Sequence, residues 1–310
     1  MIARSDALQF LRGLLMGCAD IVPGVSGGTV ALILGIYERL VGAISRFDMQ
    51  GVRLVARGEF KRAAVHVDLR FLVFLLAGIA TALLALGSTM HFLLEHHRER
   101  TLSSFFGMIL ASTWLVTAQV GRWSAKLVVM LLAGGVFAYW LVGLPVFENP
   151  PRGMPWLFFC GAIAICAMIL PGISGAFILL ILGEYYEVTG VLKKFSHLEF
   201  VAHDIGIVVA FVAGALVGIL SFSRVLKWLL RDHHAPTMAV LAGFMLGSLR
   251  KIWPFQVDAT PQIENFEHKS FDNLWPDLGS SGTWITVLCA VVAGFAVLAL
   301  EKWAARHAHH

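Results

Sequence analysis

Long apolar stretches separated by short polar segments make up most of this chain of 310 residues. The clearest stretches cover residues 71–94, 127–144, 205–220 and 284–300. Their lengths are close to the roughly 20 apolar residues that a helix needs to cross the hydrocarbon core of a bilayer. The hydrophobic pattern therefore predicts an all-α polytopic membrane protein.

The amino-acid composition agrees with this pattern. Hydrophobic residues make up 58% of the chain and the mean hydropathy is +0.76, which is too apolar for a soluble domain of this size. The four cysteines all lie inside apolar stretches without a Cys-x-x-Cys spacing, so we expect packing residues rather than disulfides or metal ligands. We predict no cofactor, no metal site and no nucleic-acid partner.

Two of the apolar segments contain a Pro-Gly pair followed by Ser-Gly, a combination that must break a helix. The first phrase covers residues 20–28 and the second covers residues 169–176, with matching positions 148 residues apart. Corresponding broken segments in two halves of a chain are the best sequence indication of a transporter's binding site. The predicted hairpin turns are Pro23 with Gly24 and Pro171 with Gly172.

The similarity between the halves continues beyond these phrases, with an offset of 136 residues. This offset pairs Gly78 with Gly214 and Gly107 with Gly243. We therefore predict two repeats, each made of one broken hairpin and three transmembrane helices, although the third helices are matched only by position and hydropathy. The predicted boundaries are 8–145 for repeat 1, 155–302 for repeat 2, and 8–45 and 155–192 for their hairpins.

The distribution of Lys and Arg predicts how each broken segment meets the membrane. The loop over residues 46–70 carries six basic residues, and a single crossing by the first segment would place it outside, against the positive-inside rule. A re-entrant hairpin keeps this loop cytoplasmic, with both termini, and places the acidic segment 254–282 outside. The basic residues left outside are scattered along the sequence. Three crossings per repeat then make the two repeats inverted relative to each other.

The two hairpins together predict an anion site near the middle of the membrane. The helix after each turn begins with N–H groups that lack an intrahelical partner, and each helix start carries roughly half a positive charge. Hydroxyl groups add donors there, and glycines let a ligand approach the backbone. A tight turn with a serine cap is the better explanation of one phrase alone, but two matching copies favour a binding site. The expected phosphate-binding residues are Ser26, Gly27, Gly28, Thr29, Ser174 and Gly175.

Charged residues at membrane depth are costly and therefore indicate function. Asp20 lies beside the first turn, and its counterpart is Met168, so the halves differ there. Asp20 either carries a proton or pairs with a cation, or it caps the N–H groups of its own turn. Arg12 either snorkels to the interface or approaches the hairpin base. The residues expected to serve coupling or charge pairing are Asp20, Glu38, Arg39, Arg12 and Glu184.

The run from Gly13 to Thr29, with Leu34–Glu38, resembles the first motif of a bacterial membrane family, the PopT-type undecaprenyl-phosphate transporters. The run Leu170–Gly175 and residues 183–185 resemble the second motif, and the resemblance covers essentially the whole chain. It implies return of the carrier lipid undecaprenyl phosphate from the outer to the inner leaflet of the bacterial cytoplasmic membrane. The residues that match the motifs are Asp20, Pro23, Gly24, Ser26, Gly27, Gly28, Thr29, Tyr37, Glu38, Pro171, Gly172, Ser174 and Gly175.

The alternative to a transporter is a membrane enzyme, because undecaprenyl-pyrophosphate phosphatases also pair inverted repeats with re-entrant hairpins. Their phrase is Pro-Gly-x-Ser-Arg-Ser, whereas Gly27 and Gly175 stand in the arginine position here. The cation that would stabilise transferring phosphoryl charge is therefore missing. A channel for small anions would need a continuous polar path, which no hydrophobic segment provides. We therefore predict a lipid transporter that works by alternating access, with proton coupling as one option and the oligomeric state open.

Overall fold

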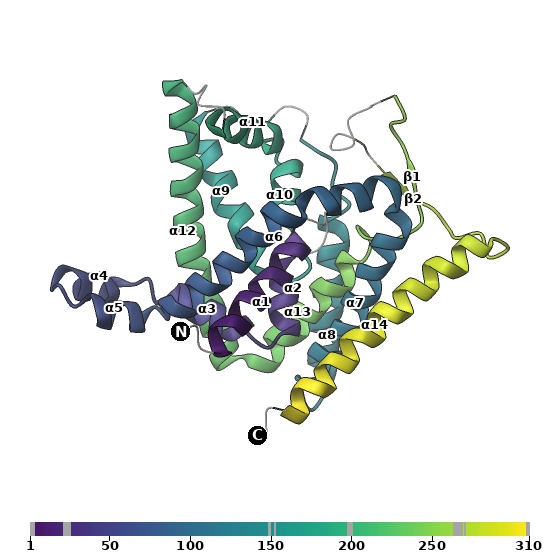
Figure 1. The fold of residues 1–310 in the computed structure, drawn as a ribbon, viewed down its shortest axis with the longest axis horizontal. Coiled ribbons are helices and arrows are strands. Elements are labelled where there is room, and N and C mark those ends of the chain that lie inside the picture. The colour runs from purple at the N-terminus through teal and green to yellow at the C-terminus, as the bar shows by residue number, and fades with distance from the viewer. Residues whose placement is uncertain are drawn as a thin grey trace.

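The computed structural model describes residues 4–20, 26–147, 150–151, 153–196, 201–262, 269 and 271–307, and it is almost entirely helical (Figure 1). The predicted turn residues Pro23 and Gly24 lie outside the described residues. The helices of the first half are α1 (Arg4–Asp20), α2 (Gly27–Ile33), α3 (Tyr37–Ser45), α4 (Met49–Ala56), α5 (Phe60–His66), α6 (Leu69–His96), α7 (Arg98–Ala118) and α8 (Ala125–Leu141). The second half contains α9 (Met154–Ile169), α10 (Gly175–Ile181), α11 (Tyr185–Ser196), α12 (Ala202–Asp232), α13 (His234–Ser248) and α14 (Ser281–His307), with β1 (Gln256–Asp258) and β2 (Phe271–Asn273) paired antiparallel before α14.

The first helix of each hairpin packs closely along the first long helix of the same half, α1 along α6 and α9 along α12. The contact is so close that a Cβ atom on any of four glycines would collide with the backbone of the partner helix. Glycine at these positions lets the helix backbones touch, as in other membrane helix pairs. The four contacts are Gly13 with Leu75, Gly78 with Phe10, Gly161 with Phe211, and Gly214 with Phe158.

The last helix of each half packs on the other half. Helix α14 lies along α7, with Gly107 against the backbone of Ala290, and α8 lies along α13, with Gly243 against the backbone of Leu131. Gly107 and Gly243 are counterparts in the two halves, so the two contacts correspond if α8 is the counterpart of α14. This packing supports the third helix pair, for which the sequence offered only position and hydropathy.

A single residue joins α6 to α7 in the first half and α12 to α13 in the second half. His97 lies between α6 and α7 with φ −133° and ψ 36°, and His233 lies between α12 and α13 with φ −134° and ψ 47°. Four residues later, Thr101 Oγ1 donates to the carbonyl of His97 at 2.9 Å, and Thr237 Oγ1 donates to that of His233 at 2.7 Å. The two joints therefore have the same backbone geometry and the same threonine hydrogen bond.

The second arm of each hairpin consists of two short helices, α2 with α3 and α10 with α11. Gly35 ends α2 with φ +66°, and Gly183 ends α10 with φ +80°. In each half the next residue donates back across the turn, Ile36 N to the carbonyl of Ala31 and Glu184 N to that of Leu179. This is the glycine C-cap that stops a helix, and the chain bends by 120° between α2 and α3.

Within the described residues, four helices are long and apolar enough to cross a membrane, α6, α7, α12 and α14, and the bent pair of α2 and α3 would be a fifth if it forms one span. Helices α8 and α13, which were expected to be the other two crossings, have only 17 and 15 residues. At a rise of about 1.5 Å per residue, both are shorter than the hydrocarbon core. The termini, the α4–α5 pair and the α12–α13 joint lie toward one end of the molecule, which we call the inner end (Figure 1). Strands β1 and β2, helix α11 and the α6–α7 joint lie toward the other, the outer end (Figure 1).

Candidate functional site

The tips of the two hairpins contact each other directly. Ser26 Oγ lies 3.2 Å from the carbonyl oxygens of both Met168 and Leu170, and it can donate to either. The N–H group of Gly172 donates to Thr29 Oγ1 at 2.8 Å. Ser26 and Thr29 are fully buried. Residues separated by more than 140 positions in the sequence therefore form one small polar cluster, which we call the tip cluster.

The start of helix α2 is capped by the protein's own groups. Asp20 Oδ1 accepts from Gly27 N at 2.6 Å, and Ser26 Oγ accepts from Gly28 N at 3.1 Å. The carbonyl of Ser26 accepts from Thr29 N at 2.9 Å. Of the two alternatives for Asp20, the cap of its own turn is thus the one present in this conformation. The helix start holds an anion already, and that anion is a carboxylate.

Gly27 has no space for a side chain. A Cβ atom there would lie 2.6 Å from Asp20 Oδ2, and one on Gly28 would lie 2.5 Å from the carbonyl oxygen of Ile169. The glycines therefore let the Asp20 carboxylate and the second hairpin approach the start of α2 closely. In the sequence the same glycines were expected to admit a ligand.

The start of helix α10 differs from that of α2. Ser174 is its N-cap residue, but among the described residues no side chain caps this helix, and Ser174 is only half-buried. Met168 occupies the place that corresponds to Asp20, and Ala176 in the first turn is exposed. The two copies of the phrase thus form one helix start that is closed by a carboxylate and one that is open.

The charged residues near the hairpin bases form pairs away from the tip cluster. Glu38 Oε1 lies 3.1 Å from His234 Nε2. Arg39 Nε donates to Asp68 Oδ2 at 2.7 Å, and its guanidinium lies 4.3 Å from the centre of the Phe71 ring. These contacts join α3 to the α12–α13 joint and to the start of α6, and their role is to fix the hairpin base.

Arg12 lies close enough to Arg39 at the hairpin base for their charges to interact, but its described hydrogen bond is to another residue. Its Nη1 atom donates to Gln9 Oε1, one turn earlier on the same helix, at 3.2 Å. The short distance along α1 explains this choice, because a residue three positions away lies on the same helix face.

Glu184 directly follows Gly183, the glycine that ends α10, and only 3% of its surface is exposed. Its buried Oε2 atom lies near the buried Nε1 donor of Trp156, although the two do not form a hydrogen bond of good geometry. Cys160 and Glu187 complete its surroundings. Because Glu184 follows Gly183 at the far end of α10, it lies outside the tip cluster.

Three basic residues that the sequence left scattered come together at the outer end: Arg98, Arg250 and Lys251. Lys251 Nζ lies 4.5 Å from the centre of the ring of Phe177, which belongs to the first turn of α10. Burial, and then the charges of Arg98 and Arg250, lower the pKa of Lys251 from its usual value. One sequence signal could have drawn attention to Lys251. The offset of 136 places Leu115 at the corresponding position of the first half, so Lys251 has no charged counterpart.

A second basic cluster lies at the inner end. Arg224, Lys227 and Arg231 lie one helical turn apart on α12 and line a cavity of about 270 Å³ with Trp228, Ser45 and Asp48. The N–H group of Gly51 donates to Asp48 and holds the pKa of that carboxyl below its usual value. The cavity opens where the predicted cytoplasmic loop joins α3 to α6.

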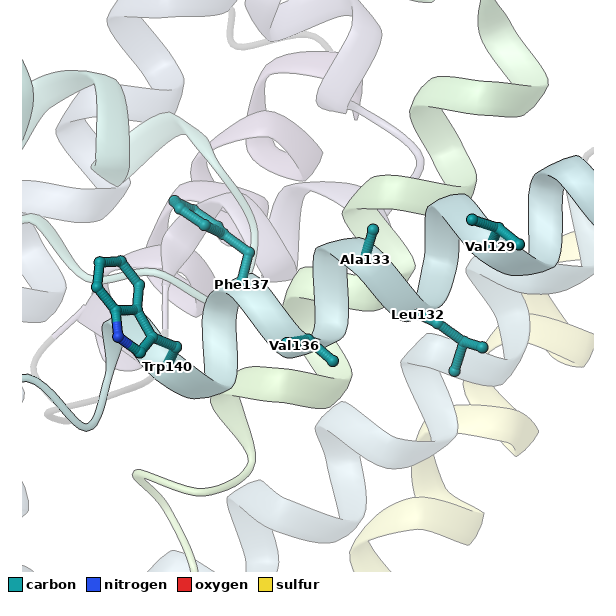
Figure 2. Close-up of a pocket in the computed structure, with 6 residues that line it drawn as sticks. All are labelled: Val129, Leu132, Ala133, Val136, Phe137 and Trp140. Atoms are coloured by element: carbon teal, nitrogen blue, oxygen red, sulfur yellow. The ribbon is translucent and has the colours of Figure 1, made fainter.

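An apolar groove runs along the outward face of α8 (Figure 2). It has a volume of about 580 Å³, and Figure 2 shows that the labelled side chains all come from this one helix. The ring of Phe137 lies 5.8 Å from that of Phe244 on α13, and the carbonyl of Phe244 faces Gly172 in the second hairpin turn. The groove is therefore linked through one packed side chain to the tip cluster. Its lining residues are Val129, Leu132, Ala133, Val136, Phe137 and Trp140.

Comparison with known proteins places this geometry in a family. Residues 16–269 match the undecaprenyl phosphate translocase-like family. The chain is 38% identical to the polyprenyl-phosphate transporter of Vibrio cholerae serotype O1, over 95% of this chain and 96% of that protein. It is 30% identical to the polyprenyl-phosphate transporter of Staphylococcus aureus, over 80% of this chain and 86% of that protein. No solved structure matches the chain.

Proposed function

The chain belongs to the undecaprenyl phosphate translocase-like family, and we propose that it returns undecaprenyl phosphate from the outer to the inner leaflet of the bacterial cytoplasmic membrane. The observation that carries this proposal is the tip cluster, in which the start of α2 meets the second hairpin turn and already holds the carboxyl group of Asp20. A site that binds a carboxylate through a backbone N–H group, with hydroxyl groups in the same cluster, has the chemistry to bind a phosphate.

The lipid phosphate would bind first at the open helix start, at Ser174 and Gly175. It would then compete with the Asp20 carboxylate for the N–H group of Gly27, and with the Ser26 hydroxyl for the N–H group of Gly28. A carboxylate that is displaced inside the membrane is disfavoured unless it takes up a proton. Displacement of Asp20 therefore supplies a physical route by which phosphate movement and proton movement are coupled.

We propose that the two repeats are inverted and that access to the tip cluster alternates between the two membrane faces. The duplicated glycine contacts support two bodies, α1 with α6 and α9 with α12. The equal joints at His97 and His233 are the places where these bodies connect to the helices behind them. Rocking of one body against the other would open the tip cluster to the outer end and then to the inner end.

The polyprenyl tail needs an apolar path that stays continuous with the lipid. We propose that it lies in the groove on α8, since the Phe137–Phe244 contact links this groove to the second hairpin turn. The phosphate could then occupy the tip cluster while the tail remains outside the helix bundle.

The enzyme alternative has little support from the site. Both relatives are named as transporters, and the family is described as translocase-like. A phosphatase-like arginine in place of Gly27 would also collide with Asp20, whose Oδ2 would lie 2.6 Å from its Cβ. We therefore assign a transporter rather than an enzyme.

Proteoliposome transport tests this function. Purified protein would be reconstituted with fluorescent polyprenyl phosphate in the outer leaflet, with and without a pH gradient, and the lipid that reaches the inner leaflet would be measured. Matched vesicles with the corresponding polyprenol, which lacks the phosphate, serve as the control. Transport of phosphate and alcohol at equal rates would contradict a phosphate site, and free phosphate as the product would show an enzyme.

A further inference from the structure

We propose that Lys251 is the cation that first binds the lipid phosphate at the outer end, an inference that rests on the proposed function. It is placed by the chain that follows α13. Lys251 N donates to the carbonyl of Ser248 at 2.9 Å, and Gln256 Nε2 donates to the carbonyl of Lys251 at 3.2 Å. Both bonds hold the backbone of Lys251 between α13 and strand β1.

The side chain of Lys251 lies against the second hairpin. Its Nζ atom is 4.5 Å from the centre of the Phe177 ring, and this ring is itself 8% exposed. An ammonium above an aromatic face is attracted by the ring, which orients Lys251 without neutralising it. The turn of the hairpin is equally close to this segment, because a Cβ on Gly172 would lie 2.8 Å from Ser248 Oγ.

The charges around Lys251 favour an anion. Arg98 donates to Gln256 Oε1 at 2.9 Å and lies 3.5 Å above the ring of Phe271, while Arg250 donates to the carbonyl of Tyr139 at 3.0 Å. Both guanidinium groups are therefore fixed near Lys251 by polar and aromatic contacts. Three half-buried cations attract an anion that approaches from outside.

No carboxylate forms an ion pair with Lys251 in the part of the chain that the structure describes. Asp258 interacts with Arg98 through its charge, and its Oδ2 atom is bound by Lys269 at 2.7 Å. A half-buried ammonium without a carboxylate partner is costly, whereas a phosphate would neutralise it. Lys269, at the same end of the molecule, differs from Lys251 because its charge is already neutralised by Asp258.

The chemistry of lysine suits a site that binds and then releases. A lysine ammonium is a point charge, and it does not grip a phosphate with the two parallel hydrogen bonds that arginine forms. The first repeat has Leu115 at the corresponding position, so the feature exists at the outer end only. Lys251 would thus make capture from the outer leaflet different from release into the inner one.

Binding of a short polyprenyl phosphate, geranylgeranyl phosphate, to the purified full chain tests this proposal, with geranylgeraniol and inorganic phosphate as comparison probes. Lys251→Gln and Lys251→Met both keep the apolar stem on Phe177 but remove the charge. Each should weaken geranylgeranyl phosphate binding by about tenfold to a hundredfold, as expected for a lost hydrogen bond to a charged group, and leave geranylgeraniol binding unchanged. Lys251→Arg should retain most of the affinity.

Lys269→Gln, a lysine at the same end that already has a carboxylate partner, is the matched control and should not change binding of the lipid phosphate. Equal affinity of wild type and both neutral variants would overturn the role of Lys251, and so would an equal loss for phosphate and alcohol. If inorganic phosphate competes as well as the lipid, the site is a general phosphate site and the lipid assignment fails. If the wild type itself does not distinguish phosphate from alcohol, the proposed function fails instead.

Discussion

The two hairpins have nearly the same backbone but opposite electrostatic surroundings. The first ends in a helix start that is closed by Asp20 and Ser26, and the second ends in an open helix start with Lys251 nearby. The counterparts of Asp20 and Lys251 are Met168 and Leu115, which carry no charge. The comparison teaches that two similar hairpins differ at single positions, and that under the proposed function one side would compete with an anion and the other would attract one.

Separate loss of the two hydroxyls is the strongest test of this comparison. Ser174→Ala should weaken lipid-phosphate binding with little change in stability, because Ser174 caps nothing in this conformation. Ser26→Ala should lower stability by about 0.5–2 kcal/mol, since it removes a helix cap. Each lost hydrogen bond to phosphate costs about 1.5–3 kcal/mol, so the double variant should bind at least a hundredfold more weakly. Binding titrations and thermal unfolding measure both effects, and unchanged affinity in the double variant would remove the tip cluster as the phosphate site.

The close approach of Asp20 to the helix start can be tested with one methyl group. Gly27→Ala should destabilise the protein by about 1–3 kcal/mol, because the added Cβ overlaps the carboxylate of Asp20 and forces it to move. Gly42→Ala is the matched control, since a Cβ there meets nothing within 4 Å. Equal unfolding temperatures of the two variants would show that Asp20 does not lie against Gly27.

Asp20→Asn keeps an oxygen for the helix cap but removes the charge. Stability should change by less than about 1 kcal/mol, because Asn and Asp cap helices equally well. Transport should continue and lose its dependence on a pH gradient, as measured in the proteoliposome assay. Asp68→Asn, which removes an acid paired with Arg39 at the hairpin base, should leave the pH dependence intact. An Asp20→Asn variant with unaltered pH dependence would leave Asp20 as a cap alone.

Single cysteine substitutions should have the smallest effect on the protein, and they test the inverted arrangement of the two repeats rather than binding or stability. Single cysteines in residues 51–61 should react with an impermeant reagent only from the cytoplasm, and those in residues 258–262 only from outside. Transport should be unaffected because both segments are outside the tip cluster. Labelling of both segments from the same side would contradict the inverted repeats and, with them, the opposite roles of the two hairpins.

Much of this frame was predictable because helix breaks and glycine positions are local properties of the sequence. The Pro-Gly phrases located the two helix breaks, and the 136-residue offset paired Gly78 with Gly214, the glycines that pack α6 on α1 and α12 on α9. The sequence could not show that Gly35 would end α2 early, since the apolar pattern continues across it into α3. Nor could it choose between the two roles of Asp20, or bring Arg98 to Lys251, because both depend on contacts between segments distant in sequence.

The exchange of last helices between the halves has a consequence for biogenesis. Helix α7 is made early, but its glycine face at Gly107 is covered only by α14, the last helix of the chain. In the same way, α8 is synthesised before α13, the helix of the second half that packs along it. During synthesis the first half would therefore remain incomplete in the membrane until the second half has been inserted, and a nascent chain stopped after α13 would leave the face of α7 exposed to lipid or to quality-control proteases.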